Sequence, residues 1–361
     1  MHVLINRDGF LKRVLIGMGH FLLFFTLLNG CASTAKSEDM AFGGWVTYWD
    51  FERGMSSLQK ADTLLQDVYF FVAALDSQGT PFWVKEDLPF SVEIARIRTL
   101  GGVPWMTVVN DVHAGTEGSY VLKDSEVVHA LLENHEKRKK HRQEIVRLAV
   151  EKGFLGVDID YENLLAEDRD LFTLFIQELS EDLKKEGIQL SVTVQPKKGP
   201  SRGVGSGAAD WAELCKTADR LQIMLYNLHN GKTDPGPMAT LTWIQEIWRY
   251  ARKECADEKI VPVLKVSGML WGSDEVKGIH FQDAELLARE HGVEIQRHLD
   301  GQSPYFSYTV GEKRYTAYYE DSLSLREKVS LLKSLNCRRI LFWSFGKQDP
   351  ALLPDLQALS F

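Results

Sequence analysis

Eight short apolar runs, each separated from the next by a longer polar or amphipathic stretch, constrain the fold of this chain more than any other feature. Short apolar runs that alternate with helical stretches are typical of a parallel sheet, because a helix must return the chain to the same edge after each strand. Eight such units are the number that closes a (β/α)8 barrel. We therefore expect an α/β fold of the TIM-barrel type, with strands over 44–49, 68–75, 103–109, 155–161, 189–194, 221–226, 260–266 and 340–343.

The helical stretches between these runs are clearest over 127–152, 166–186, 240–256 and 323–335. Between the seventh and eighth runs the chain is too long for one helix, and residues 272–321 mix one helical segment with strand-like ones. This pattern predicts a small α+β insertion. Barrel topology places it at the mouth, where functional residues collect at the carboxyl ends of the strands.

The fourth apolar run carries carboxylates at alternate positions. Successive strand side chains point to opposite faces, so Asp158, Asp160 and Glu162 share one face, opposite the apolar residues between them. Three crowded acids raise one another's pKa values and are costly to bury. A carboxylic acid kept protonated near neutral pH is what general acid catalysis requires, so we interpret this cluster as catalytic.

Two other interpretations of the acids are a solvated edge strand and a cation site with oxygen ligands. The position of the run, after a long amphipathic helix and among apolar strands, argues against an edge. The spacing partly resembles an EF-hand but lacks the turn glycine and the distal glutamate of that loop.

Residues 1–30 are predicted to be a targeting segment. Arg7, Lys12 and Arg13 precede an apolar run from Val14 to Leu28, which is long for the core of a signal peptide and short for a membrane span. An uncleaved anchor and an ordinary secretory signal are the alternatives to a lipoprotein signal peptide.

The segment Leu28-Asn29-Gly30-Cys31 resembles a bacterial lipobox, with Cys31 as the residue that carries lipid. Residues 31–40 would then be a short polar tether, and 41–361 the folded domain. We expect a protein of the bacterial cell envelope, lipid-anchored to a membrane.

The other three cysteines, Cys215, Cys255 and Cys337, are far apart and lack the paired spacing of metal or redox sites. We expect buried free thiols, although a Cys215–Cys255 disulfide is compatible with the sequence. No cofactor and no metal are expected.

The formal net charge of −8 becomes −10 when residues 1–30 are removed. An acidic domain does not attract nucleic acid, so that class of partner is not expected. The sequence also lacks the His-Glu-x-x-His motif of zinc proteases and the Gly-x-Ser-x-Gly motif of esterases.

With the barrel, the acidic run resembles the signature of glycoside hydrolase family 18, Asp-x-x-Asp-x-Asp-x-Glu at the end of the fourth strand, with Leu155 in place of the first aspartate. Residues 222–227 resemble the family's Met-x-Tyr-Asp, with Asn227 in place of its aspartate. Residues 342–346 resemble its eighth strand. The segments 305–308 and 319–321 are most similar to the branch of spore-cortex and cell-wall hydrolases, and the resemblance covers about residues 43 to 350.

The resemblance implies a substrate-assisted retaining mechanism. Glu162 would protonate the glycosidic oxygen while the 2-acetamido oxygen of the sugar attacks the anomeric carbon. Asp160 would hydrogen-bond the acetamido N–H, and Asp158 would tune the protonation of Asp160. Tyr226 would hold the acetamido group, and Trp343 would stack under the sugar ring.

Further residues are candidates for substrate binding. Asn227 keeps a hydrogen-bonding side chain. Trp49, Trp105 and Trp271 lie near strand ends and are candidates to line a glycan groove. For Tyr226 and Trp343, packing inside the barrel is the competing interpretation.

Other polar and aromatic residues are expected to be structural. Trp243 and Trp248 lie within one helix and are expected to pack it against the barrel. His135 and His141 lie in a highly charged helix and are expected to face solvent. Lys265 interrupts an apolar strand and is a candidate to neutralise an interior carboxylate.

These observations predict a lipid-anchored hydrolase that cuts β-1,4 bonds next to N-acetylglucosamine in peptidoglycan or a chitin-type glycan. Two alternatives stay open: a surface lectin on a barrel that has lost activity, and an enzyme that acts on protein-linked glycans. The presence of Glu162 argues against the lectin, whereas Leu155 and Asn227 favour it weakly.

Overall fold

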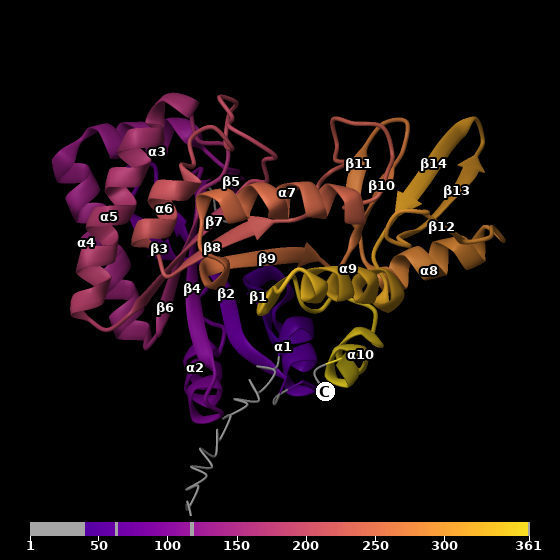
Figure 1. The fold of residues 1–361 in the computed structure, drawn as a ribbon, viewed down its shortest axis with the longest axis horizontal. Helices are drawn as coiled ribbons and strands as arrows, with labels where there is room; N and C mark the ends of the chain where they lie inside the picture. The colour runs from indigo at the N-terminus through magenta and orange to yellow at the C-terminus, as the bar shows by residue number, and fades with distance from the viewer. Residues whose placement is uncertain (1–39, 62–63, 116–118, 360–361) are drawn as a thin grey trace, which may run out of the picture. The chain divides into compact units, whose positions relative to one another are not determined.

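The computed structural model describes residues 40–61, 64–115 and 119–359 (Figure 1). The predicted signal peptide, Cys31 and all but the last residue of the predicted tether lie outside the described residues. Among the helices that are described, none is long and apolar enough to cross a membrane.

Eight parallel strands form a closed barrel, which confirms the predicted fold. The ring closes through the pairing of β1 with β15 and of β2 with β4. Every strand lies within a few residues of its predicted position. In chain order the barrel strands are β1 (Ala41–Thr47), β2 (Leu65–Leu75), β4 (Val103–His113), β6 (Gly156–Asp160), β7 (Gln189–Val194), β8 (Arg220–Met224), β9 (Ile260–Lys265) and β15 (Arg339–Trp343).

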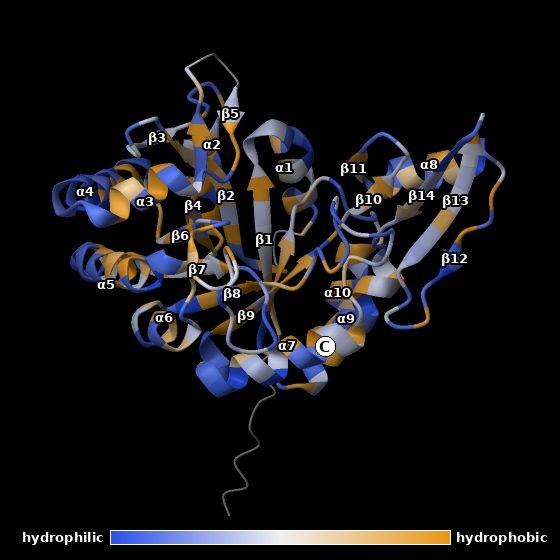
Figure 2. Cartoon of the chain, turned by 90° about the horizontal axis from the view of Figure 1, so that it is seen from above, coloured by the Kyte–Doolittle hydropathy of each residue, from blue (hydrophilic) through white to orange (hydrophobic). Residues whose placement is uncertain are grey.

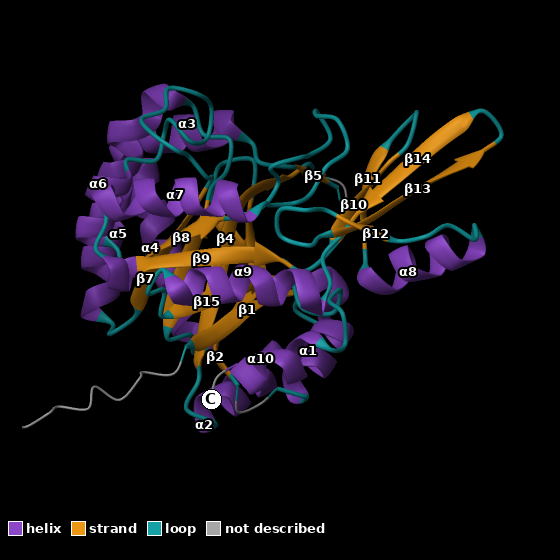
Figure 3. Cartoon of the chain, turned by 45° about the vertical axis from the view of Figure 1, so that its right-hand side comes forward, coloured by secondary structure: helices purple, strands orange, loops and turns teal. Residues whose placement is uncertain are grey.

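Helices surround the barrel and cover the apolar outer faces of its strands (Figure 3). Hydrophobic and hydrophilic residues alternate along α4 and α5 in Figure 2, as expected for helices with one face on the strands and one in solvent. The covering helices are α1 (Phe51–Gln59), α2 (Phe90–Thr99), α3 (Ser125–Glu133), α4 (His135–Lys152), α5 (Arg169–Lys185), α6 (Trp211–Thr217), α7 (Leu241–Glu254), α9 (Ser322–Ser334) and α10 (Leu352–Leu359).

The single helix predicted over 127–152 is two helices. Asn134 has an extended backbone and ends α3, and its side chain accepts a hydrogen bond from the backbone N–H of Lys137 to cap α4. An asparagine that caps a new helix interrupts the old one at little energetic cost.

The amino-terminal end of the barrel is filled with aromatic rings. Tyr69 stacks between Trp45 and Trp105, with ring centroids 4.6 and 5.1 Å away. Asp67 accepts a hydrogen bond from Trp105 Nε1 at 2.9 Å and pairs with Arg220 at 2.8 Å. Trp105 is therefore part of this plug, and the expectation that it lines a glycan groove is wrong.

The predicted insertion lies between β9 and β15 and begins at Gly268, slightly earlier than expected. Its five strands form an antiparallel sheet in the order β11-β10-β14-β13-β12, with α8 beside it (Figure 3). A buried pair, Lys328 Nζ to Glu320 Oε2 at 2.7 Å, fixes the return from the insertion to α9. The elements are β10 (Gly268–Trp271), β11 (Val276–Ile279), α8 (Phe281–Glu290), β12 (Gln296–Arg297), β13 (Pro304–Val310) and β14 (Lys313–Tyr318).

Short strands and 3-10 turns extend these elements. β3 (Pro81–Trp83) pairs with β2, and β5 (Tyr120–Val121) pairs with the end of β4, which fixes the residues just before α3 near the barrel mouth. The 3-10 turns span Tyr48–Asp50, Ala166–Asp168 and Asp257–Lys259.

Two other structural expectations need correction. Cys215 and Cys255 form a disulfide, with Cα atoms 5.6 Å apart, and of the three cysteines that the structure describes only Cys337 is a buried free thiol. His141 is buried, whereas His135 is exposed as expected.

The two helix tryptophans pack as predicted. Trp248 is buried in the layer between α7 and the strands, and Trp243 packs against the same layer.

Candidate active site

The acids of β6 lie at the carboxyl end of the barrel, on the inner face of the strand. Asp158 and Asp160 are buried inside the barrel, while Val157, Ile159 and Tyr161 join the apolar layer under the helices. The predicted division of the two strand faces is therefore confirmed. Leu155 precedes β6 and is about 16 Å along the strand from Asp160, so this replacement lies far from the chemistry.

Three hydroxyl groups surround Asp158. Ser191 and Thr193 donate to Oδ1, each at 2.9 Å, and Thr107 donates to Oδ2 at 3.1 Å. Burial raises the pKa of Asp158 to about 7, although the three hydroxyl groups oppose this rise because they stabilise the carboxylate. At neutral pH, the protonated and ionised forms of Asp158 are therefore both populated.

Asp160 is two residues closer than Asp158 to the carboxyl end of β6, and therefore closer to the barrel mouth. Its Oδ1 is buried and has no hydrogen-bond partner among the described residues. Burial raises the pKa of Asp160 well above its usual range, the cation of Lys123 lowers it, and the charge of Glu162 raises it again. A buried carboxyl oxygen without a protein partner at a barrel mouth is suited to bind a polar group of a ligand.

Asn110, at the end of the neighbouring strand β4, fixes the backbone of Glu162. Its Nδ2 donates to the carbonyl oxygen of Glu162 and its Oδ1 accepts from the Glu162 N–H, both at 2.9 Å. The same Nδ2 lies 3.4 Å from the carbonyl oxygen of Asp124. These two hydrogen bonds fix the backbone of Glu162 relative to β4, although Glu162 lies two residues after the end of β6.

Lys123 lies beside the Glu162 side chain. Its Nζ is 3.3 Å from Glu162 Oε1 and 3.5 Å from Asp111 Oδ1, and its backbone N–H donates to the same Asp111 oxygen at 3.0 Å. Burial lowers the pKa of Lys123, but the charges of Asp160, Glu162 and Asp111 outweigh burial and raise it overall. Lys123 therefore stays charged at neutral pH.

Sequence reasoning missed Asn110, Asp111 and Lys123. The polar pair Asn110-Asp111 directly follows the third apolar run, which is the position where barrel enzymes carry functional residues. That pair was a usable signal. No local sequence pattern indicates that Lys123 contacts Glu162, because the pairing of β4 with β5 brings it there.

Tyr226 lies just after β8 and is buried beside the acids. Burial raises its pKa well above the usual value, and the charges of Glu162, Asp160 and Asp158 add to the rise. The next residue, Asn227, is exposed and accepts a hydrogen bond from Lys265 Nζ at 3.4 Å. Lys265 thus contacts an amide rather than the interior carboxylate that the sequence suggested.

The aromatic candidates differ in exposure. Trp343, at the end of β15, is half-buried and makes edge contacts with Trp45 and Phe71. Trp49 is 50 % exposed at the mouth, whereas Trp271 is only 5 % exposed and donates from Nε1 to the carbonyl oxygen of Asn230. Trp343 and Trp49 therefore offer more surface to a ligand than Trp271 does.

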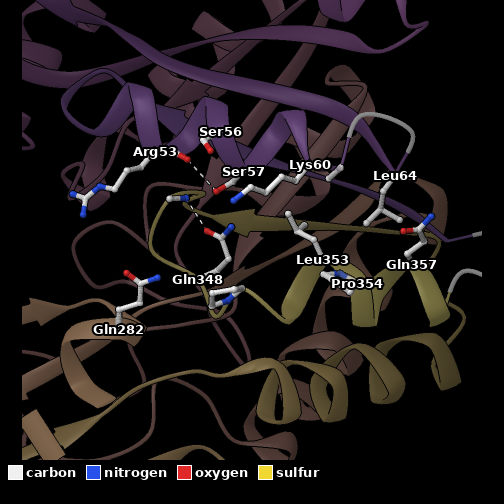
Figure 4. A pocket seen from close by; sticks show the side chains of 13 residues that line it. Arg53, Ser56, Ser57, Lys60, Leu64, Gln282, Gln348, Leu353, Pro354 and Gln357 are labelled. Carbon is white, nitrogen blue, oxygen red and sulfur yellow. Dashed lines mark hydrogen bonds between the residues drawn. The ribbon is translucent and has the colours of Figure 1, made fainter. Parts of the chain in front are cut away.

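Two pockets lie away from the acids. One pocket, of about 550 Å³, lies between the loop after β8 and the insertion sheet, and Trp271, Tyr305 and Arg314 are among the residues that line it. The other, about 380 Å³, lies between α1 and α10, where Arg53, Lys60 and Gln348 line it (Figure 4). Neither is lined by a carboxylate of β6.

Within the described part of the chain, no group of three or more His, Cys, Asp or Glu side chains has an arrangement that holds a metal ion. The β6 carboxyl groups are instead surrounded by hydroxyl donors and by the ammonium group of Lys123. Donors and a cation around the acids favour proton transfer or ligand binding over cation binding.

Comparison with known proteins agrees with this geometry. The model of glycosyl hydrolases family 18 matches residues 123–349. The cortical fragment-lytic enzyme of Bacillus subtilis (strain 168) is 27 % identical over 228 residues, which are 61 % of this chain and 53 % of that protein. The same enzyme of Bacillus anthracis is 24 % identical over 272 residues, which are 72 % of this chain and 61 % of that protein. The chain thus spans little more than half the length of these relatives.

Solved structures support the fold. The spore cortex-lytic enzyme SleL of Bacillus cereus has a TM-score of 0.76 and 21 % identity, with 89 % of this chain and 74 % of that chain covered. A chitinase from Chromobacterium violaceum ATCC 12472 has a TM-score of 0.78 and 21 % identity, with 89 % and 98 % covered. At this identity the likeness concerns the fold alone.

Proposed function

Because the chain belongs to glycosyl hydrolase family 18, we propose that it hydrolyses β-1,4 bonds next to N-acetylglucosamine by a substrate-assisted mechanism that retains the anomeric configuration. The observation that carries this proposal is the acid cluster: one carboxyl group at the mouth, and two buried behind it with raised pKa values. A single exposed acid with supporting carboxyl groups suits this mechanism, because the nucleophile comes from the substrate.

Glu162 is the proposed proton donor. It follows the barrel strand, its side chain is 23 % exposed, and Asn110 fixes its backbone. In the first step the bond between the anomeric carbon and the glycosidic oxygen breaks, and that oxygen takes the proton of Glu162. The 2-acetamido oxygen forms a new bond to the anomeric carbon, which gives an oxazolinium ion.

Asp160 and Tyr226 are proposed to hold the acetamido group during this step. The unpartnered Oδ1 of Asp160 is available to accept a hydrogen bond from the acetamido N–H. Asp158 is proposed to tune the protonation of Asp160, since its own pKa lies near neutrality. Water then attacks the anomeric carbon and returns a proton to Glu162, so the second inversion restores the starting configuration.

The aromatic residues at the mouth are proposed to bind the sugar rings. Trp343 is half-buried at the end of β15, a position where an exposed part of an aromatic ring favours stacking with a sugar. Trp49, Asn227 and Trp271 are proposed to contact neighbouring sugars.

Peptidoglycan or a chitin-type glycan is the proposed polymer. The likeness to the cortical fragment-lytic enzymes of two Bacillus species supports cell-wall material. We further propose that Cys31 carries lipid and anchors the protein in the cell envelope. Metabolic labelling with a palmitate analogue tests the anchor: wild type should be labelled and Cys31→Ala should not, whereas equal labelling of both would overturn it.

Turnover by the full chain tests the activity. Wild type, Glu162→Gln and the control Glu167→Gln are incubated with chitooligosaccharides and with purified peptidoglycan, and the products are analysed by mass. Glu167 is an exposed acid five residues further along. We expect products that end in reducing N-acetylglucosamine from wild type and from the control but not from Glu162→Gln. No turnover with glycan binding retained by all three proteins would instead indicate a lectin.

A further inference from the structure

Two lysines lie on one side of the barrel mouth. The acids belong to β6 and to the end of β4, and three strands separate β6 from β15 in either direction around the ring. The side formed by the ends of β9 and β15 is therefore opposite the acids. It carries Lys265 and Lys347.

Lys265 is the last residue of β9 and is aligned with Trp343 of β15 in the parallel register. Its Nζ contacts the Asn227 amide oxygen at 3.4 Å. Among residues 40–61, 64–115 and 119–359, no carboxylate forms an ion pair with it. Burial and then the charge of Lys347 lower the pKa of Lys265 to about 8, and the charge of Glu320, which is itself paired with Lys328, opposes this fall only in part.

Lys347 is in the loop after β15, with its Nζ 5.8 Å from the ring centroid of Trp49. It too lacks an ion pair with any carboxylate that the structure describes. Asp50, whose charge raises the pKa of Lys347, is already paired with Arg53 at 2.6 Å.

Two partly buried lysines that repel each other raise the free energy of the unliganded protein. An anion between them would relieve that repulsion and would form charge-assisted hydrogen bonds. Asn227 matters here, because an aspartate at this position would pair with Lys265 and remove the free cation. Lys347 lies near the exposed ring of Trp49, and Lys265 is aligned with Trp343. Both tryptophans are proposed to bind sugar.

We propose that Lys265 and Lys347 form a subsite for a carboxylate on the glycan, so that the protein prefers a polymer with acidic sugars or acidic peptide branches to neutral chitin-type chains. The inference rests on the proposed function for its substrate. Peptidoglycan has carboxylates of two kinds: the lactyl group of N-acetylmuramic acid, and the acids of the attached peptides.

The test compares four glycans of equal length: a neutral chitooligosaccharide, peptide-free peptidoglycan strands with free lactyl carboxylates, the same strands with those carboxylates reduced to alcohols, and peptide-bearing strands. The full chain is used as wild type, Lys347→Met, Asn227→Asp and Lys313→Met. Lys313 pairs with Asp274 on the insertion, so the last variant controls for the loss of a positive charge elsewhere. Thermal unfolding verifies that each variant folds.

We expect the ratio of kcat/KM between carboxylate-bearing and reduced strands to fall about tenfold in Lys347→Met and in Asn227→Asp, while Lys313→Met keeps the wild-type ratio. A fall confined to peptide-free strands would assign the subsite to the lactyl group, and a fall confined to peptide-bearing strands to the peptide. Equal ratios in all four proteins would overturn the proposal.

Calorimetric binding to the Glu162→Gln protein separates this inference from the proposed hydrolysis. If wild type turns over none of the glycans, the hydrolase proposal fails. The subsite is still supported if Glu162→Gln binds carboxylate-bearing strands about tenfold more tightly than reduced ones and Lys347→Met removes that difference. Binding that ignores the carboxylate would overturn the subsite.

Discussion

Lys123 Nζ lies 3.3 Å from Glu162 Oε1, so the residue proposed as proton donor is held by a lysine from the loop before α3. The same ammonium group lies 3.5 Å from Asp111 Oδ1, which ties the Glu162 side chain to the end of β4 as well. Asn110 fixes the Glu162 backbone from that strand. The third and fourth barrel strands thus position both the backbone and the side chain of one residue.

Lys123→Met should lower kcat about tenfold and change KM much less. The Glu162 side chain would lose the hydrogen bond from the Lys123 ammonium group, which its carboxyl oxygen accepts whether or not the acid is protonated. It would then adopt orientations that do not reach the glycosidic oxygen, and misplacement of a catalytic group costs more in rate than in binding. Lys123→Arg should recover part of the rate, because it restores the cation. Steady-state kinetics of the three proteins check this, and an unchanged kcat in Lys123→Met would show that the lysine has no part in positioning Glu162.

Asp158→Asn should change how stability depends on pH. Burial raises the pKa of Asp158 from 3.8 to about 7, so between these values the folded protein keeps a proton that the unfolded chain has released. The free energy of unfolding of wild type should therefore fall as pH rises through this window, by up to about 4 kcal/mol from this group. Asparagine cannot ionise, so the variant should gain stability relative to wild type between pH 4 and pH 8.

Urea unfolding of both proteins at several pH values measures this difference. The asparagine can keep the hydrogen bonds: its oxygen accepts from Ser191 and Thr193, and its amide donates to Thr107. A constant difference between wild type and variant across this range would contradict the raised pKa.

The strands and the acid cluster were predictable because their signals are local. The two-residue period of β6 assigns Asp158 and Asp160 to the inside, and eight apolar runs determine the barrel. The helix break at Asn134 was not predictable from periodicity, since residues 133–144 contain no apolar residue that would mark a helix face on either side of it. A single side-chain cap decides the boundary.

The contacts of Lys123 and His141 were not predictable because both depend on segments distant in sequence. Lys123 reaches Glu162 across 39 positions, and His141 reaches the Gly79 carbonyl oxygen across 62. His141 shares the buried face of α4 with Ile145 and Leu148, four and seven residues later, so the helical period was a usable signal for its burial. Its partner, the Gly79 carbonyl group, has no such signal.

Tyr161→Phe should destabilise the fold by about 1 to 3 kcal/mol. His141 Nδ1 lies 2.6 Å from the Gly79 carbonyl oxygen and must donate to it, so Nε2 is the acceptor for the Tyr161 hydroxyl group, also at 2.6 Å. Removal of the hydroxyl leaves a buried nitrogen without a partner. Urea unfolding at pH 7 measures the loss, and a stability equal to wild type would show that this hydrogen bond contributes nothing.

His141 should also contribute to acid sensitivity. Burial lowers its pKa from 6.5 to about 4, so between these values the unfolded chain binds a proton that the folded protein does not. Stability should fall by about 3 kcal/mol from this group as pH decreases through the window. His141→Gln offers a donor and an acceptor without a charge and should show a smaller loss between pH 7 and pH 4. An equal loss in both proteins would contradict the assignment.

The Cys215–Cys255 disulfide joins the end of α6 to the residue after α7 and closes a loop of 40 residues. A cross-link of this length reduces the entropy of the unfolded chain by an amount worth about 4 kcal/mol, so Cys215→Ser with Cys255→Ser should lower the free energy of unfolding by up to that value. Alkylation of denatured protein with and without reductant should differ by two thiols, since Cys337 is free. Cys337→Ser serves as the control: it should leave that difference at two, and equal alkylation in both conditions would show that the disulfide is absent.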